Sequence, residues 1–454
     1  MATRAGGSTG DMSLDDDYFE SWDSEMDSEM DSECYCCCSD CESDADSFVS
    51  ETDVNFNFLH VNPVHVKRLD NTRQSPESQS LTSQSPVAAS HPSSEEPAEV
   101  ALTNASSIEP VTFIPQNPRD RAVIREIYQS GTKFYDRKTL QYLADVFDAW
   151  AAAPEDNTTK AILTDLLGDK YEISNETGQD PHVPESPHTL ERFKARPLVH
   201  YMTYNRMARL GFGRFGSKRS PFRVFQPMGI HYAAEWRDPD TKEVDAPPEG
   251  DLQGWTFSRF RREYRRSVKK WKKKKVFEAI KACLEQRNLR GINKVVMFGG
   301  GTMTRDYGET YTTRSFNQHG LVVLLGRLLA KYNPHATIQL FAQDPSYGGF
   351  DNQLLEDQGI KVLHDPRGFL EVDENTIVLS FYFIPTHSVL VDLTRPAVFI
   401  CNSSPREHLE PRVLEMRDNE YDATAMPGDD RFAEDAEVLI RKNIGVKAKK
   451  KRSA

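Results

Sequence analysis

The stretch KVVMFGGGTMT (Lys294–Thr304) decides the fold class of this 454-residue chain. A short apolar run rich in β-branched residues ends in three glycines, a pattern typical of a buried strand followed by a tight turn. The next apolar segment, QHGLVVLLGRLLAKY (Gln318–Tyr332), has the length and composition of a helix. A strand followed by such a helix begins a β–α–β unit.

The same alternation continues towards the C-terminus. Short apolar runs predict four more strands, at Thr337–Phe341, Ile360–Leu363, Thr376–Tyr382 and Ala397–Cys401. A short helix is expected at 351–357, ended by Gly359. Because nearly continuous apolar strands alternate with helices, the sequence predicts an α/β, Rossmann-like three-layer domain with a mainly parallel sheet over residues 291–404.

In an open α/β sheet, ligands bind beyond the carboxyl ends of the strands, where the strand order reverses. Polar residues and glycines follow each predicted strand, at 299–302, 344–347, 364–366, 385–387 and 402–404. The fold is expected to bring these loops to one edge of the sheet, which makes that edge the candidate ligand site.

The glycines after the first strand do not fit an ordinary dinucleotide site. Gly299 and Gly301 match the first two positions of the G-x-G-x-x-G fingerprint, but Thr304 replaces the third glycine. The acid Asp344 follows the glycines by about twice the number of residues that the fingerprint requires. A methyl-donor nucleotide, with glycines after strand one and an acid after strand two, stays open. Neither a nucleophilic triad nor a metal cluster stands out, so we nominate no catalytic or metal-binding residue and name no cofactor.

Charge divides the chain into unlike parts. Residues 1–110 carry 23 acidic and 4 basic residues and are rich in Ser and Pro, which predicts a disordered acidic tail. Residues 111–290 are predicted to be a helical region, with helical segments at 115–150, 160–167 and 189–210, the last interrupted near Pro197, and with Asp136 as an N-cap. Residues 405–454 are expected to be a C-terminal extension with a basic end. A membrane span is not predicted, because no apolar stretch is long enough.

A basic segment lies within the helical region. Residues 259–275 hold eleven Lys and Arg, interleaved with Phe260, Tyr264 and Trp271. On a helix, these aromatic residues and Val268 form one apolar stripe, so the segment can dock as a helix with a solvated basic face. Nuclear localisation and nucleic-acid binding are alternatives. The candidate residues for nucleic-acid or partner binding are Arg261, Arg262, Arg265, Lys269 and Lys272.

The α/β part resembles a known family. Its ordered motifs are KVVMFGGGTMT, RSFNQHGLVVLLGRLL, FAQDPSYGGFDNQLLEDQGIKVL, DENTIVLSFYFIPTHSVLVDL and AVFICNSS. Taken together, they resemble the sensitivity-to-red-light-reduced-like (SRR-like) domain family, in a fungal-type member with a long acidic N-terminal tail. The resemblance covers residues 294–404.

The resemblance implies a regulatory protein in signalling, clock or light input, or cytoskeleton-related regulation. Protein partners and a location in cytoplasm and nucleus are expected. Haem is a further ligand that the resemblance suggests, with His387 as an axial ligand, although neither Cys283 nor Cys401 is followed by the proline of a haem-binding motif. The candidate ligand-binding residues are Gly299, Gly301, Arg314, Gln318, Asp344, His387 and Asn402.

Overall fold

The computed structural model describes residues 66–68, 118–154, 158–179, 191–209, 225–237, 244–245, 255–304, 309–381 and 385–442. Of the predicted acidic tail, only residues 66–68 are described, and the basic end at 447–452 lies outside the described residues. The predictions for the other residues of the tail and for the basic end therefore stay predictions. Three residues of the predicted disordered tail, Val66–Arg68, form strand β1, which pairs antiparallel with β3 (Lys170–Ser174). For these three residues the prediction of disorder is wrong.

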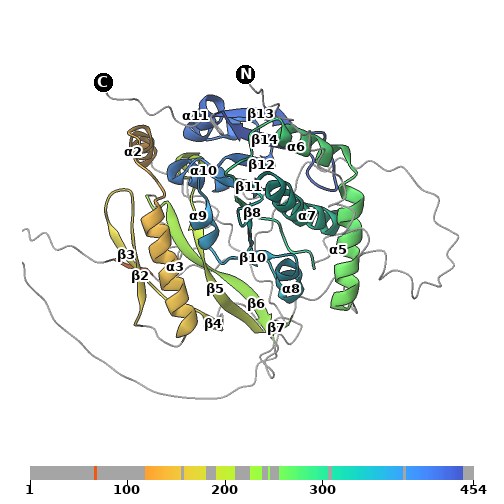
Figure 1. Ribbon diagram of the computed structural model, residues 1–454. Coiled ribbons are helices and arrows are strands. Elements are labelled where there is room, and N and C mark those ends of the chain that lie inside the picture. The colour runs from red at the N-terminus through yellow and green to blue at the C-terminus, as the bar shows by residue number, and fades with distance from the viewer. Residues whose placement is uncertain are drawn as a thin grey trace, which may run out of the picture. The chain divides into compact units, whose positions relative to one another are not determined.

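A seven-stranded sheet forms the centre of the α/β part, in the order β10-β9-β8-β11-β12-β14-β13 (Figure 1). The strands are β8 (Lys294–Phe298), β9 (Gln339–Gln343), β10 (Ile360–Val362), β11 (Thr376–Ser380), β12 (Val398–Asn402), β13 (Tyr421–Ala425) and β14 (Ala436–Arg441). The first five are parallel, and β14 runs antiparallel to both of its neighbours. All five predicted strands are confirmed. The predicted C-terminal extension is instead partly integral to the sheet, because it supplies β13 and β14.

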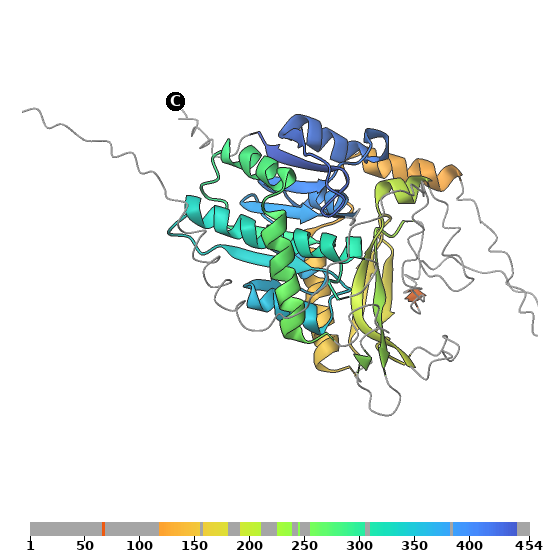
Figure 2. The same cartoon turned by 90° about the vertical axis from the view of Figure 1, so that its right-hand side faces the viewer.

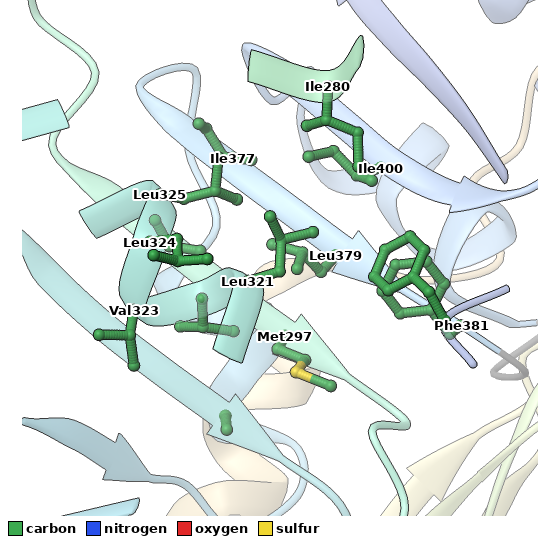
Figure 3. Close-up of a cluster of buried hydrophobic side chains, with 14 of the residues drawn as sticks. Ile280, Met297, Leu321, Val323, Leu324, Leu325, Ile377, Leu379, Phe381 and Ile400 are labelled. Atoms are coloured by element: carbon green, nitrogen blue, oxygen red, sulfur yellow. The ribbon is translucent and has the colours of Figure 1, made fainter. Parts of the chain in front are cut away.

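One face of the sheet packs against α6 (Lys275–Glu285), α7 (Glu309–Tyr332) and α8 (Gly349–Asp357), and α5 (Phe257–Trp271) packs on the outer side of α7. Helix α7 is apolar around most of its circumference because it lies between the sheet and α5. Figure 3 shows its Leu321 and Leu325 among side chains of β8 and β11. A Cβ on Gly320 would lie 2.5 Å from the Val268 side chain, so this glycine permits α5 and α7 to pack closely.

The opposite face carries the second part of the core. It is covered by α9 (Arg367–Glu371), α10 (Pro385–Leu393) and α11 (Pro411–Glu420), with the one-turn 3₁₀ helix Arg406–His408 leading into α11. Helices α2 (Pro118–Gln129) and α3 (Arg137–Ala152) of the N-terminal region add to this core. Helices on both faces of the sheet confirm the predicted Rossmann-like three-layer fold.

The region before the α/β part is mixed, and the prediction of a helical region is wrong for much of it. Beyond α2, α3 and α4 (Tyr204–Arg209), it contains two antiparallel sheets. Their strands are β2 (Lys160–Thr164), β3, β4 (Gly178–Gln179), β5 (Glu191–Tyr201), β6 (Met228–Arg237) and β7 (Val244–Asp245).

Both mistaken helices contain signals for strands. In β2, Ala161 and Leu163 are buried while their neighbours are exposed, which is a period of two. In β5, the register of pairing with β6 shifts between Lys194 and Arg196, just before Pro197. Such an irregularity lets a strand contain a proline. The predicted N-cap at Asp136 is confirmed, since its side chain accepts a hydrogen bond from Thr139 N.

A buried carboxylate on α10 anchors the N-terminal region. Asp392 accepts hydrogen bonds from the backbone N–H groups of Phe134 (2.7 Å) and Tyr135 (3.3 Å). It also forms an ion pair with Arg412 of α11 at 3.2 Å. The N-terminal segment is thus held against the second face of the sheet by polar contacts as well as apolar ones.

Candidate functional site

The glycine loop after β8 lies at the point where the strand order reverses. The chain leaves β8 towards β9 on one side, and β11 pairs with β8 on the other. Gly299 and Gly301 have φ values of +65° and +68°, which side chains rarely adopt. A Cβ on Gly300 would lie 2.2 Å from Met297 Cε and 2.8 Å from His319 Cε1. All three glycines are therefore required by the local backbone geometry and packing.

Asp344 connects this glycine loop to the loop after β9. Its Oδ2 accepts a hydrogen bond from Gly301 N at 2.8 Å, and its Oδ1 accepts one from Ser346 N at 2.8 Å. The residue is half-buried. The structure thus brings together three of the predicted ligand residues, Gly299, Gly301 and Asp344, and gives Asp344 a structural role there.

A second carboxylate below the loop was not among the predicted ligand residues. Asp351, in the first turn of α8, is fully buried. It accepts hydrogen bonds from Thr302 Oγ1 (2.6 Å), Met303 N (2.8 Å) and Gly348 N (2.9 Å). Burial raises the pKa of its carboxyl group, and these hydrogen bonds oppose that rise. In the sequence, Asp351 appears as an acid in the first turn of a helix that follows Gly-Gly. This pattern indicates a helix N-cap interaction as readily as a ligand-binding residue.

His319 on α7 completes the support of the glycine loop. Its Nδ1 lies 2.7 Å from the carbonyl oxygen of Ser315, and its Nε2 lies 2.7 Å from the hydroxyl of Tyr347. Because a carbonyl can only accept, Nδ1 carries the proton and Nε2 accepts from the tyrosine. Burial lowers the pKa of His319 to about 4, so the imidazole is neutral at pH 7.

Arg314 and Gln318 face a different segment. Arg314 Nε donates to the carbonyl of Asp430 at 2.9 Å, and Gln318 Nε2 donates to that of Phe432 at 2.6 Å. An ion pair of 3.2 Å joins Arg314 to Glu434. These two predicted ligand residues therefore hold the connection between β13 and β14 against α7, a segment beyond the predicted domain boundary at 404.

His387 and Asn402 lie on opposite faces of the sheet. The ring of His387 packs on Phe399, with ring centres 4.8 Å apart, in the core of the second face. Asn402 is three residues beyond Phe399 on the same strand, so it points to the first face. The Nε2 of His387 and the Oδ1 of Asn402 are buried and form no hydrogen bond within the described residues. Burial, with a further contribution from Arg417, lowers the pKa of His387 to about 4.

Strand β5 covers the carboxyl ends of β9 and β10 (Figure 2). Arg196 donates to the carbonyl of Pro345 and lies 3.2 Å from His364 Nδ1. The carboxylate of Asp365 accepts hydrogen bonds from Val199 N and from the Tyr201 hydroxyl. Part of the predicted ligand edge is thus occupied by a strand from the N-terminal region, which the prediction of a helix at 189–210 could not foresee.

The buried Asp365 makes the attachment of β5 sensitive to pH. Burial raises its pKa to about 6, from an ordinary value of 3.8. Folding therefore favours the protonated form, so the stabilisation that Asp365 provides falls as pH rises from about 4 to 6, by up to ~3 kcal/mol. We expect Asp365→Ala to cost more free energy of unfolding at pH 4 than at pH 7. Urea unfolding of both proteins at each pH measures this, and a pH-independent difference would contradict it.

The basic segment forms α5 and the start of α6. Its apolar stripe is buried, with Phe260 and Trp271 at 0% and 2% exposure, which confirms docking through the stripe. Of the five predicted binding residues, Arg262 is exposed, while the other four are half-buried. Arg261 pairs with Asp357 of α8 at 3.8 Å. The most exposed basic side chains of α5 also include Arg266 and Lys270, which the prediction did not name.

Within the described residues, no group of three or more His, Cys, Asp or Glu side chains is arranged to hold a metal ion. Among the helices that the structure describes, none has the length and apolar character needed to cross a bilayer.

The fold and the glycine edge define a Rossmann-like α/β protein. Comparison with family models shows which family this part of the chain resembles: residues 269–437, less than half of the chain, match the SRR1 domain. The match begins near the end of α5 and ends at the start of β14, so most of the basic helix lies before it. The search of curated proteins gives no match.

Solved structures share only distant similarity with this chain. A putative O-methyltransferase from Klebsiella pneumoniae has 13% identity and a TM-score of 0.25, covering 43% of this chain and 92% of that one. A precorrin-6y C5,15-methyltransferase from Geobacter metallireducens has 13% identity and a TM-score of 0.20, covering 36% and 87%. A cofactor-bound protein from MTB has 10% identity and a TM-score of 0.25, covering 39% and 88%.

Proposed function

We propose that this protein, part of which matches the SRR1 domain, is a regulatory protein that acts by binding macromolecular partners rather than by catalysis. The observation that carries the proposal is the use of polar residues at the predicted ligand edge. Arg314 and Gln318 bind backbone carbonyls of the β13–β14 connection, and Asp344 binds backbone N–H groups of two loops. Groups held in this way stabilise the fold and leave fewer positions to contact a small molecule.

The cover provided by β5 supports the same proposal. It places Arg196 on the loops after β9 and β10, and Val199 and Tyr201 on Asp365. In a nucleotide-binding α/β protein, these strand ends form the binding crevice. A domain whose crevice is partly closed by its own chain is better suited to present surfaces to a partner. We propose that this role is exercised in cytoplasm and nucleus, which the basic clusters of the sequence support.

Ligand titration of the full-length protein tests this function. We expect no saturable heat in calorimetry and no rise in melting temperature with S-adenosylmethionine, ATP, NAD or haem, each added at millimolar or solubility-limited concentration. A ligand that binds the native protein but not the unfolded chain raises the melting temperature by mass action. Saturable binding of S-adenosylmethionine, ATP, NAD or haem, with a rise in melting temperature, would overturn the proposal.

Such a result would favour the second candidate, an enzyme or sensor for a nucleotide-like ligand. One observation favours it: Gly299 and Gly301 form a turn of positive φ at the switch point, beside the half-buried Asp344. A methyl-donor nucleotide is the ligand class of this candidate. Haem fits less well, because the Nε2 of His387 is buried and its ring packs on Phe399. The core would have to repack before this imidazole could bind iron.

A further inference from the structure

The solvent-facing side of α5 is a continuous basic surface. We call the exposed side chains Arg259, Arg262, Arg266 and Lys270 of α5, together with Lys273 and Lys274 of the turn that follows it, the α5 basic surface. The opposite side of the helix is buried against α7, through Phe260, Tyr264 and Val268 among others. Because the apolar side is fixed in the core, the helix presents its charges in a rigid row and not on a flexible segment.

Little negative charge balances this row. Residues 255–275 contain eleven basic side chains and one acid, Glu263. Glu263 lies 3.9 Å from Arg266, whose side chain is still 66% exposed. Within the described part of the chain, Arg262, Lys270 and Lys273 form no ion pair. The cations are therefore available to a partner that carries closely spaced negative charge.

Arg262, Arg266 and Lys270 are spaced four residues apart. At a rise of 1.5 Å per residue, successive members of this row are about 6 Å apart along the helix. A nucleic-acid duplex carries one negative charge per ≈ 1.7 Å of its axis, so several phosphates lie within reach of a row of this length. Phosphate contacts of this kind need exposed cations and no precise pocket.

The buried aromatic residues decide between kinds of nucleic acid. Single strands are bound by stacking bases on exposed aromatic rings. Here Phe260, Tyr264 and Trp271 are at most 2% exposed, so they cannot stack on bases. With only cations exposed, α5 can contact the phosphate backbone but not the bases. A duplex does not need base stacking on the protein, because its bases are already stacked on one another.

We propose that the α5 basic surface binds the phosphate backbone of double-stranded nucleic acid, without sequence preference. This names a partner class for the binding role proposed above. Protein interfaces gain most of their affinity from buried aromatic or arginine anchors, and the aromatic side chains of α5 face inward. Membrane-surface helices insert an apolar face, and that face of α5 is covered by α7.

The net charge of the whole chain, −13, does not prevent this binding. At physiological ionic strength, charges more than about 8 Å apart in solution are largely screened from one another. A phosphate in contact with Arg262 or Lys270 therefore interacts mainly with the local basic row. The overall negative charge is expected to slow the encounter, and to do so most at low salt.

Fluorescence anisotropy of the full-length protein with a labelled duplex of about 20 base pairs tests the proposal. The test variant is the triple substitution Arg262→Gln, Arg266→Gln, Lys270→Gln. Its matched control, Lys133→Gln, Lys138→Gln, Lys361→Gln, removes the same charge from exposed positions elsewhere. Gln is a good helix former, and all six side chains are exposed, so both variants are expected to keep the wild-type melting temperature.

The logarithm of the wild-type binding constant should fall linearly with the logarithm of salt concentration, by roughly 0.9 for each phosphate contact. In the test variant we expect a slope smaller by about 2.7 and an affinity at least about tenfold lower at about 50 mM salt, with the control like wild type.

Four outcomes would overturn the proposal. They are no binding by the wild type, equal binding by wild type and test variant, tighter binding to a single strand of the same length, and tighter binding to polyglutamate or to vesicles of anionic phospholipid. None of them bears on the small-ligand titrations, so failure here is distinguishable from failure of the proposed function.

Discussion

Substituting Glu437 by leucine is expected to lower the free energy of unfolding by about 3–5 kcal/mol. The carboxylate of Glu437, on β14, receives two parallel hydrogen bonds from Arg417 of α11, at 2.6 and 2.7 Å. The two side chains are 5% and 16% exposed. Removing one member leaves the other charge buried without its partner, and this desolvated charge is the main source of the cost.

A double variant separates this effect from loss of packing. In Arg417→Met with Glu437→Leu, no buried charge remains, so urea unfolding should show that much of the stability lost in Glu437→Leu is recovered. The matched control is Asp418→Ala, which lies beside Arg417 on α11 and breaks the exposed pair with Arg406 of the preceding 3₁₀ helix. That pair is solvated, so its loss should lower the free energy of unfolding far less than Glu437→Leu does. If the double variant is no more stable than Glu437→Leu, the buried charge is not the cause.

Replacing Asp351 by alanine is expected to cost about 3 kcal/mol or more. The change leaves two buried donors, Thr302 Oγ1 and Met303 N, without this acceptor, and each such loss is worth roughly 1–3 kcal/mol. Asp351→Asn keeps one oxygen as an acceptor and should fall between alanine and wild type. Urea unfolding measures the cost, and amide hydrogen exchange should accelerate at Met303 and Gly348.

Asp357→Ala provides the control for Asp351 on the same helix. Asp357 is exposed at the last turn of α8, and among the residues that the structure describes its side chain forms only a 3.8 Å ion pair with Arg261. Its removal should change the free energy of unfolding by no more than about 0.5 kcal/mol. If both variants of α8 lost the same stability, Asp351 would not be the residue that holds the glycine loop to α8.

The parallel sheet could be predicted from the sequence because each strand is a short apolar run bounded by Gly, Pro or Asp. The run Thr376–Ser380 is buried at every position, and such a run has few alternatives to a central strand. The antiparallel strands were harder to recognise. Glu191–Tyr201 mixes charges with apolar residues around a proline, and it becomes a strand by pairing with Met228–Arg237, which is distant in the sequence.

The candidate site was predicted in part. Gly301 and Asp344 meet as expected, because both follow neighbouring parallel strands. Arg314 and Gln318 were assigned to a ligand, yet they bind the connection between β13 and β14. A polar side chain near a strand end has the same appearance in the sequence whether it contacts a ligand or a backbone carbonyl. Only the position of that distant connection distinguishes the two roles.

Local sequence patterns were sufficient to predict the order of strands and helices along the α/β part, and also the apolar stripe and basic face of α5. These features depend on local periodicity and composition. The tertiary structure alone decided which polar groups stay available, because β5 and the β13–β14 connection arrive from far along the chain and use the carboxylates and amides at the sheet edge. Hydrogen-bonding capacity is a local property of a residue, whereas its use depends on which distant segment reaches it.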